Sequence, residues 1–246
     1  MKLLLLCDAS VGNAIAEWLL ESYPEDIGAV VTVSESAVCI AARKRGIPGV
    51  VFESEAQLRG ALGALASFDL GVLAWWPKLI SPALMSLTKS GFINTHPSFL
   101  PYNRGKHYNF WALVEQAPFG VSLHFVDAGI DSGDIVAQQA IPYDWEDNGQ
   151  SLYAKAGAGV VELFKSVYPQ IRSGAIRRTP QDVSKGSLHY ARELDAASSV
   201  HLDKHYTARE LINLLRARTF PGHPACRFED NGETYEITVN IKRKSV

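Results

Sequence analysis

The sequence predicts an α/β protein with a Rossmann-like, mostly parallel sheet and helices on both of its faces, followed by a small helix and β-hairpin. Short apolar runs alternate with helical patterns through the first two-thirds of the 246 residues. These runs lack polar alternation, as is typical of strands buried on both faces. Apolar residues make up 47% of the chain, enough for a sizeable core.

Strands and helices are expected to alternate along residues 1–172. Short apolar runs predict strands at 2–6, 29–33, 49–52 and 70–74, and further strands are expected at 92–95, 121–126 and 135–141. Helical spacing and good helix formers predict helices at 13–20, 36–45, 55–66, 108–115 and 151–172. A polar connector rich in Gly, Pro and Ser follows from about residue 173. We therefore expect a catalytic domain at 1–180 and an extension at 181–246.

The extension contains two clear local signals. A helix is expected at 207–218, with Thr207 as the N-cap and Glu210 completing a capping box. Asp-Asn-Gly at 230–232 lies between alternating runs and predicts a hairpin. We expect one apolar face on its second arm, formed by Tyr235, Ile237, Val239 and Ile241. Since an isolated hairpin is only marginally stable, this face needs a cover, either the main domain or a second subunit.

Charge and cysteine content exclude several classes of protein. The formal net charge of −2 gives no general electrostatic footprint for nucleic acid or a membrane. Three widely spaced cysteines indicate neither a disulfide framework nor a zinc site, and we expect reduced thiols in a cytoplasmic protein. The apolar run at 3–7 is too short for a signal peptide. No stretch approaches the ~20 apolar residues of a membrane-spanning helix.

The strand expected at 92–95 ends on an unusual pair of polar residues. Residues two apart on a strand point to the same side, so Asn94 and His96 project together and Thr95 points away. Pro97 holds His96 in an extended conformation. Ligands of open α/β sheets bind beyond the carboxyl ends of the strands. An Asn N–H can stabilise an oxyanion and a His can accept a proton, which suits acyl transfer to an amine. The alternative is that either residue is purely structural.

A Gly-rich turn between two expected strands carries Asp127, Asp131 and Asp134. Their spacing does not match a Ca²⁺ loop, and no second His or Cys lies near enough in sequence to indicate zinc, so we expect no metal. The acids either cap a tight turn, or one of them orients His96 and favours its charged form. Local spacing leaves that choice open.

These motifs together resemble the folate-dependent formyltransferases, most closely the nucleotide-sugar N-formyltransferases. The resemblance rests on Asn-x-His-Pro-Ser-x-Leu-Pro at 94–101, Arg-Gly at 104–105, Gly-Val-Ser-Leu-His at 120–124 and Asp-x-Gly-Ile-Asp-Ser-Gly-Asp at 127–134. It implies formyl transfer from N10-formyltetrahydrofolate to a primary amine, without a metal. His96 is then the general base, Asn94 the oxyanion donor, and Asp131 the residue that orients His96. Phe99 departs from the Leu that is usual in the family.

The resemblance also implies binding residues. Leu73, Lys78, Ile80, Asp127 and Gly129 correspond to the folate-binding segments. Tyr102, Arg104, His107 and Asn109 are expected to contact the acceptor, with Arg104 and Lys78 as candidates for its pyrophosphate. Arg104 is equally well explained as a turn residue. Tyr102, Tyr108, Trp75 and Trp76 are candidates for stacking on a base or pterin, although any one of them is more simply explained by core packing.

The segment 102–114 and the tail are most similar to the sugar branch of the family, although Tyr108 replaces a usual Pro. The acceptor implied is the amine of a nucleotide-linked deoxy sugar, and pairing through the C-terminal region implies a homodimer. One alternative is transfer to another amine, such as a purine precursor or a hydroxylated amino acid. Another is a folate- or nucleotide-binding homologue that has lost catalysis. A Rossmann dehydrogenase is disfavoured because no Gly-x-Gly-x-x-Gly follows the first strand.

Overall fold

The computed structural model describes residues 1–63 and 67–244. Its central sheet has seven strands in the order β3-β2-β1-β4-β5-β7-β8. They are β1 (Leu3–Cys7), β2 (Ile27–Thr32), β3 (Gly49–Val51), β4 (Leu70–Ala74), β5 (Phe92–His96), β7 (Gly120–Phe125) and β8 (Ile135–Ala140). β1 to β5 are parallel, whereas β7 pairs antiparallel with β5 and β8 antiparallel with β7. The predicted sheet is confirmed, and each predicted strand lies within two residues of an observed one.

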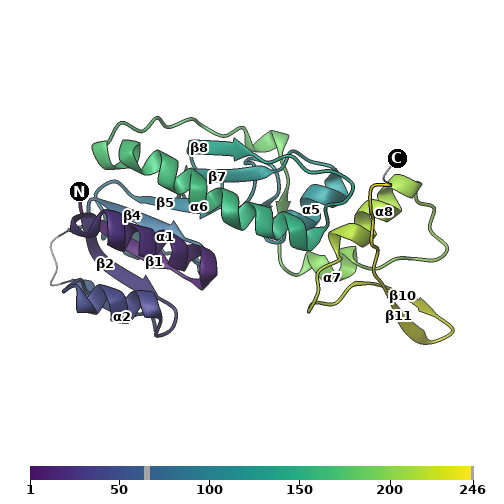
Figure 1. The fold of residues 1–246 in the computed structure, drawn as a ribbon, viewed down its shortest axis with the longest axis horizontal. Helices are drawn as coiled ribbons and strands as arrows, with labels where there is room; N and C mark the ends of the chain where they lie inside the picture. Colours follow the sequence, from purple (N-terminus) through teal and green to yellow (C-terminus); the bar gives the residue numbers. More distant parts are fainter. Residues whose placement is uncertain (64–66, 245–246) are drawn as a thin grey trace.

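Helices cover both faces of this sheet (Figure 1). They are α1 (Ala9–Ser22), α2 (Ala37–Lys44), α3 (Glu55–Leu62), α4 (Pro82–Met85), α5 (Tyr108–Glu115) and α6 (Gly149–Ser173), with a 3₁₀ turn at Pro24–Asp26. Alternate residues of β1 show the two layers. Leu3 and Leu5 belong to the core packed with α1, α2, α5 and α6, whereas Leu4 and Leu6 pack with α3 and α4.

Three predicted helix boundaries need correction. α1 begins at Ala9 rather than 13, because the chain turns into the helix directly after β1, with Asp8 at the N-cap. α6 begins at Gly149 rather than 151, because Asn148 forms a capping box with Ser151. α3 ends at Leu62, and residues 64–66 of the predicted helix lie outside the described residues.

The extension contains α7 (Glu193–Ala197), α8 (Ala208–Ala217) and the hairpin of β10 (Cys226–Asp230) and β11 (Glu233–Ile237). The predicted capping box of Thr207 and Glu210 is present. Asn231 and Gly232 both have positive φ (50° and 82°), as a two-residue I′ turn requires, so the predicted hairpin is confirmed. The apolar face predicted for its second arm is wrong beyond Ile237. Pairing stops there because β10 begins only at Cys226, shortly after Pro224.

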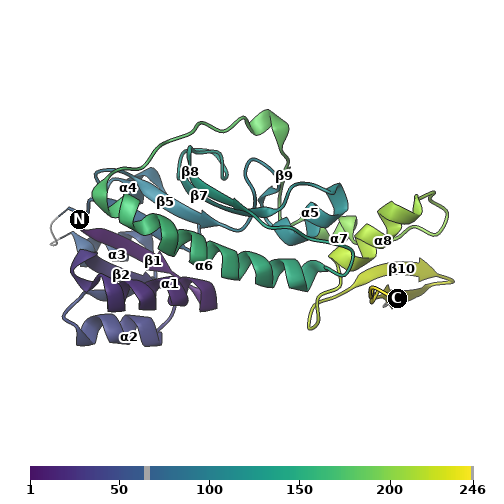
Figure 2. The same ribbon diagram turned by 45° about the horizontal axis from the view of Figure 1, so that its top comes forward.

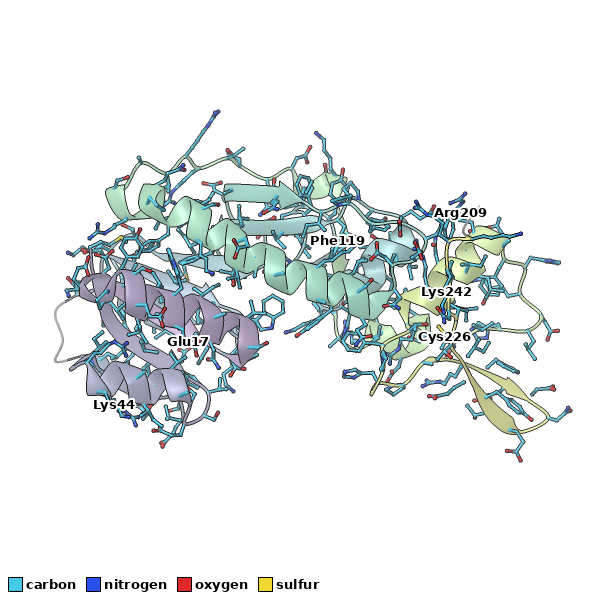
Figure 3. The ribbon with its side chains drawn as sticks, in the orientation of Figure 1. Glu17, Lys44, Phe119, Arg209, Cys226 and Lys242 are labelled. Atoms are coloured by element: carbon cyan, nitrogen blue, oxygen red, sulfur yellow. The ribbon has the colours of Figure 1, made fainter. Side chains whose placement is uncertain are left out.

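The hairpin projects away from the sheet, at the end of the molecule opposite α2 (Figures 1 and 2). The labelled side chains of Arg209, Cys226 and Lys242 mark this extension, and Glu17 and Lys44 mark the other end (Figure 3). All three cysteines are buried free thiols. Among the described residues, no helix is both long and apolar enough to cross a membrane.

The connector before α7 is less linker-like than the sequence suggests. It contains a 3₁₀ turn (Val183–Lys185) and the two-residue strand β9 (Leu188–His189), which pairs with β6 (Arg104–Gly105). A further bridge joins Thr179 to Ile135 at the start of β8. The connector therefore packs along the β8 side of the domain and returns to the segment that follows β5.

Candidate active site

Asn94 and His96 project from the end of β5 on one side, as predicted for residues two apart on a strand. β5 lies between β4 and β7, and its register places Asn94 opposite His124 and His96 opposite Ser122. Thr95 points to the other side, where its hydroxyl donates to the carbonyl of Leu73 (3.1 Å) and accepts from the N–H of Trp75 (3.0 Å). The end of β5 is thereby attached to the end of β4.

The chain after His96 is held against the sheet by Ser122. Its hydroxyl donates to the carbonyl of Ser98 (2.7 Å) and accepts from the N–H of Leu100 (3.1 Å) and from Gln138 Nε2 (2.9 Å). Ser122 and Ser98 are both buried. This contact fixes the direction in which residues 97–101 leave the strand, and so supports the position of His96.

Asp131 is the acid of the Gly-rich turn that reaches His96. Its Oδ1 lies 3.5 Å from His96 Nδ1 and 3.6 Å from His124 Nε2. Its Oδ2 accepts a hydrogen bond from the N–H of Gly105 (2.9 Å). Asp127 instead accepts from the N–H of Gly129 (3.0 Å) and from Ser132 Oγ (2.8 Å), so it caps the turn. The two roles that the sequence left open are therefore divided between different acids.

Burial and charge oppose each other in this pair. Burial lowers the pKa of His96 to about 4, although the negative charge of Asp131 acts in the opposite direction. Burial would raise the pKa of the Asp131 carboxyl, but the two histidines and the Gly105 N–H outweigh it and hold that pKa well below its usual range. His96 is therefore neutral and Asp131 ionised at neutral pH. An ionised carboxylate beside Nδ1 favours the tautomer with hydrogen on Nδ1.

The other ring nitrogen of His96 makes no hydrogen bond with the described residues. Nε2 is buried and has no hydrogen-bond partner among the described residues. Leaving a buried polar atom unpaired costs about 1–3 kcal/mol, and such atoms in native structures often mark function. With hydrogen on Nδ1, Nε2 carries a lone pair that can accept a proton.

His124 is the residue that the sequence reasoning missed. Its Nδ1 lies 2.8 Å from the carbonyl oxygen of Phe125, which can only accept a hydrogen bond, so Nδ1 carries hydrogen. In the neutral ring Nε2 then accepts from Asn94 Nδ2, 3.2 Å away. This contact orients the Asn94 amide and leaves its second N–H available. The inference that no second His lies near enough in sequence to indicate zinc overlooked His124, which strand pairing brings next to Asn94 and His96.

His96, His124 and Asp131 also form a group whose ligand atoms lie within 4.8 Å of one another, close enough to surround a metal ion. The same spacing is that of a carboxylate that orients His96 and lies beside a second imidazole. The donation of an Asn94 N–H to His124 Nε2 occupies the lone pair that a metal would need. The expectation of a site without metal stays a prediction.

The residues expected to bind folate lie on two segments beside the triad of Asn94, His96 and Asp131. Leu73 is buried in β4 and pairs directly with Asn94. Lys78 and Ile80 follow on the loop after β4, where Lys78 is exposed with its Nζ 5.6 Å from the Phe52 ring centroid. Asp127 and Gly129 lie exposed in the turn that carries Asp131. Their contacts with folate stay predictions.

The residues expected to bind the acceptor lie between β5 and α5. Arg104 is half-buried; its Nη1 lies 3.5 Å from the carbonyl of Ile130, and its buried Nε has no partner among the described residues. His107 and Tyr102 are half-buried, whereas the Asn109 amide donates to the carbonyl of Gly149 (2.8 Å). These acceptor contacts stay predictions.

The aromatic candidates divide between core and surface. Tyr108 is buried and stacks on Phe119 and Tyr153, so it packs in the core. Trp75 and Trp76 are half-buried. Trp75 makes edge contacts with Tyr108 and Tyr153, and Trp76 makes one with Phe52.

Two known protein families match parts of this chain. Residues 18–167, which contain the whole triad, match the family described as formyl transferase. The chain belongs to the formyl transferase family. The resemblance seen in the sequence is thereby confirmed, as is the prediction of a formyltransferase. Residues 193–243 match a second family, described as the N-formyltransferase dimerization C-terminal domain.

Several solved formyltransferases share the fold. A 4-N formyltransferase from Francisella tularensis is 24% identical, with a TM-score of 0.82 over 99% of this chain and 98% of that one. The formyltransferase PseJ from Anoxybacillus kamchatkensis, in complex with UDP-4,6-dideoxy-4-formamido-L-AltNAc and tetrahydrofolate, is 25% identical (TM-score 0.58; 80% and 89% covered). An N-formyltransferase from Helicobacter canadensis, in complex with folinic acid and dTDP-3-aminofucose, is 20% identical (TM-score 0.71; 93% and 85% covered).

The lowered pKa of His96 predicts a defined pH dependence of stability. The pKa is about 4 in the folded protein and ~6.5 in an unfolded chain. Between these values the unfolded state binds more protons, so the contribution of neutral His96 is full above pH 6.5 and is lost as the pH falls towards 4. In urea titrations at pH 7, 6 and 5, the stability of the parent relative to His96→Gln should fall by on the order of 1 kcal/mol per pH unit.

The titration of Asp131 does not contribute to the change in stability between pH 7 and 5. Its pKa is lowered, so its contribution is present above the unfolded pKa of ~3.9 and is lost only below that value. Parallel stability curves for parent and variant between pH 7 and 5 would contradict the assigned pKa of His96.

Proposed function

We propose that this formyltransferase moves a formyl group from N10-formyltetrahydrofolate to the primary amine of a nucleotide-linked amino deoxy sugar. The observation that carries the proposal is the end of β5. There, an imidazole nitrogen without a partner among the described residues lies beside an amide donor, and the imidazole is backed by an ionised carboxylate. This set provides a base and an oxyanion donor, the two groups that acyl transfer to an amine requires.

Each side chain has a role in the transfer. His96 Nε2 accepts a proton from the acceptor amine as the amine nitrogen bonds to the formyl carbon. The free N–H of Asn94 donates to the formyl oxygen, on which negative charge develops. The Asp131 carboxylate stabilises the imidazolium that forms on His96. It thereby offsets the destabilisation of this positive charge by burial. His96 then returns the proton to the departing folate nitrogen as the bond to the formyl carbon breaks, leaving a formamide and tetrahydrofolate.

The two segments beside the triad are assigned to the co-substrate. Lys78 and Ile80 lie after β4, and Asp127 and Gly129 lie in the turn before β8. Leu73 is the neighbour of Asn94 in the sheet. A folate bound beside Leu73 would therefore have its formyl group close to the Asn94 side-chain amide. The PseJ structure contains tetrahydrofolate, which supports the assignment.

The acceptor class is supported by related structures and by charge. Structures of PseJ and of the Helicobacter canadensis enzyme contain nucleotide-linked amino or formamido sugars. On this chain Arg104 carries a buried Nε without a partner among the described residues, and Lys78 is exposed on the neighbouring loop. We assign these two cations to the pyrophosphate, because guanidinium and ammonium groups are good phosphate donors. Tyr102, His107 and Asn109 are assigned to the sugar and the nucleotide.

Two copies of the chain are proposed to associate through the extension. Residues 193–243 match a dimerization domain, and the hairpin projects from the body of the protein. Tyr235 on the hairpin is 47% exposed and stacks on Phe228. An apolar hollow nearby is lined by Trp145, Ile212, Val239, Asn240 and Ile241. Large exposed apolar groups in one region are typical of a protein interface.

The acceptor assignment is tested with purified protein, the formyl donor and a panel of dTDP-, UDP- and GDP-linked amino deoxy sugars. Mass spectrometry should show addition of one formyl group to at least one sugar, and none to glycinamide ribonucleotide. Formylation of glycinamide ribonucleotide alone would overturn the sugar assignment, and no turnover with any amine would favour a binding homologue. Turnover should survive a chelator. If a chelator abolishes turnover and zinc restores it, His96, His124 and Asp131 form a metal site.

The catalytic roles predict the sizes of two kinetic losses. Asn94→Ala removes an oxyanion donor and should lower kcat by ~10²–10³. His96→Gln removes the base and should lower kcat by ~10²–10⁴. His205→Ala, at an exposed histidine of the extension, is the matched control and should leave kcat unchanged. Full kcat in His96→Gln would contradict the role of His96.

The proposed association predicts a dimer in sedimentation velocity. Tyr235→Lys combined with Ile212→Lys places charges in the apolar region and should shift the protein to monomer. Ile40→Lys is the matched control, because Ile40 is 41% exposed but lies on α2, at the other end of the molecule. A monomeric parent, or dissociation by the Ile40 variant alone, would contradict association through the extension.

A further inference from the structure

The connector between α6 and α7 contacts both the active-site turn and the segment between β5 and α5. Gln181 Nε2 donates to the backbone carbonyls of Asp131 and Gly133, inside the turn that carries the catalytic carboxylate. Further along the connector, β9 pairs with β6 in the segment between β5 and α5. Figure 2 shows β9 close to α5. A segment outside the matched formyl transferase residues therefore contacts both the turn that carries Asp131 and the short strand whose Gly105 N–H bonds Asp131.

The pairing of β6 with β9 determines where the Gly105 N–H points. The N–H groups of Arg104 and Lys106 donate to the carbonyls of Ser187 (3.0 Å) and His189 (2.9 Å). Successive N–H groups on a strand alternate in direction, so the intervening Gly105 N–H points away from β9. It donates to Asp131 Oδ2 instead (2.9 Å).

Gly105 is required for this approach. Its φ of 87° is rarely adopted by other residues, and a Cβ there would lie 2.2 Å from the carbonyl oxygen of His189. The contact between β6 and β9 is therefore close as well as hydrogen-bonded, and a shift of β9 would move the N–H that holds Asp131.

A cluster of polar side chains fixes β9. The His189 ring stacks on Trp111 with centroids 3.7 Å apart. Its Nε2 lies 2.7 Å from Glu115 Oε1, and its Nδ1 lies 3.0 Å from Glu193 Oε2. Each ring nitrogen therefore has a carboxylate partner, and the ring connects β9 to α5 and α7.

Glu115 also joins the two short strands. Its Oε2 accepts from Ser187 Oγ (2.7 Å) next to β9, and from Asn103 Nδ2 (2.8 Å) next to β6. Asn103 is buried and has a φ of 52°, which places the turn into Arg104 in the left-handed region. One carboxylate at the end of α5 thus holds both partners of the β6–β9 pair.

We propose that His189 and Glu115 are positioning residues for the catalytic carboxylate. They fix β9 and β6, and the β6–β9 pairing aims the Gly105 N–H at Asp131, which in turn lies against His96. The proposal rests on the proposed function for its kinetic consequence, whereas its structural part concerns the free protein alone.

The kinetic test is a double-mutant cycle. His189→Ala should lower kcat by ~10- to 100-fold with little change in either KM, because misplacement of a catalytic group costs rate rather than substrate binding. In an Asp131→Asn background the same substitution should have little further effect, since the residue that it positions is already removed. His189→Gln, which keeps a donor for Glu115, should recover part of the loss, and His201→Ala should cause none.

A second readout needs no substrate. The backbone amide of Gly105, followed by ¹H–¹⁵N NMR, reports its hydrogen bond to a carboxylate. Asp131→Ala removes the acceptor and defines the shift of the broken bond, and His189→Ala should move the Gly105 signal towards it while His201→Ala leaves it in place. Glu115→Gln, which keeps the side-chain shape, gives the same test if His189→Ala fails to fold.

Two results would overturn the proposal. One is a kcat loss from His189→Ala that is equally large in the Asp131→Asn background. The other is an unmoved Gly105 signal in the His189 and Glu115 variants. If no amino sugar is formylated but the Gly105 signal moves as expected, the proposed acceptor fails and the positioning role stands.

Discussion

The antiparallel pairing of β7 with β5 is the constraint on which the site depends. Directly opposed residues of an antiparallel pair share a face of the sheet, so this register sets His124 beside Asn94 and Ser122 beside His96. His124 orients the amide, Ser122 fixes the exit from β5, and Asp131 then reaches both histidines. A slip of one residue would turn His124 and Ser122 to the opposite face and leave Asn94 and His96 without either partner.

The balance between burial and charge gives the site its chemistry. Burial keeps His96 neutral at physiological pH, which leaves a lone pair on one ring nitrogen but disfavours the imidazolium that the proposed transfer requires. Asp131 offsets that cost only when the imidazolium appears, because it is held ionised by its neighbours. The burial of the unpaired nitrogen of His96 and of the ionised carboxylate of Asp131 lowers the stability of the folded protein. Such groups are common at functional sites.

The sequence predicted what depends on local pattern. The strand at 70–74 and the helix at 108–115 have the predicted bounds, since their apolar patterns are short-range signals. The Asn94–His96 pair could be derived from strand alternation alone. The choice of Asp131 among three acids came only from family resemblance, because it depends on how the turn folds over the sheet. His124 was missed because the register of β7 against β5 cannot be predicted from the local spacing of residues. The connector looked like a linker because its contacts are with segments distant in sequence, such as Glu115 and the turn at Asp131, and these leave no local pattern.

We infer that His96 keeps an unprotonated Nε2 because Asp131 holds hydrogen on Nδ1. Long-range ¹H–¹⁵N NMR of the imidazole, in the free protein at pH 7, measures this directly. We expect a neutral ring with the shift of a protonated nitrogen at Nδ1 and of an unprotonated nitrogen at Nε2, and a loss of that preference in Asp131→Ala. An imidazolium, or hydrogen on Nε2 in the parent protein, would contradict it.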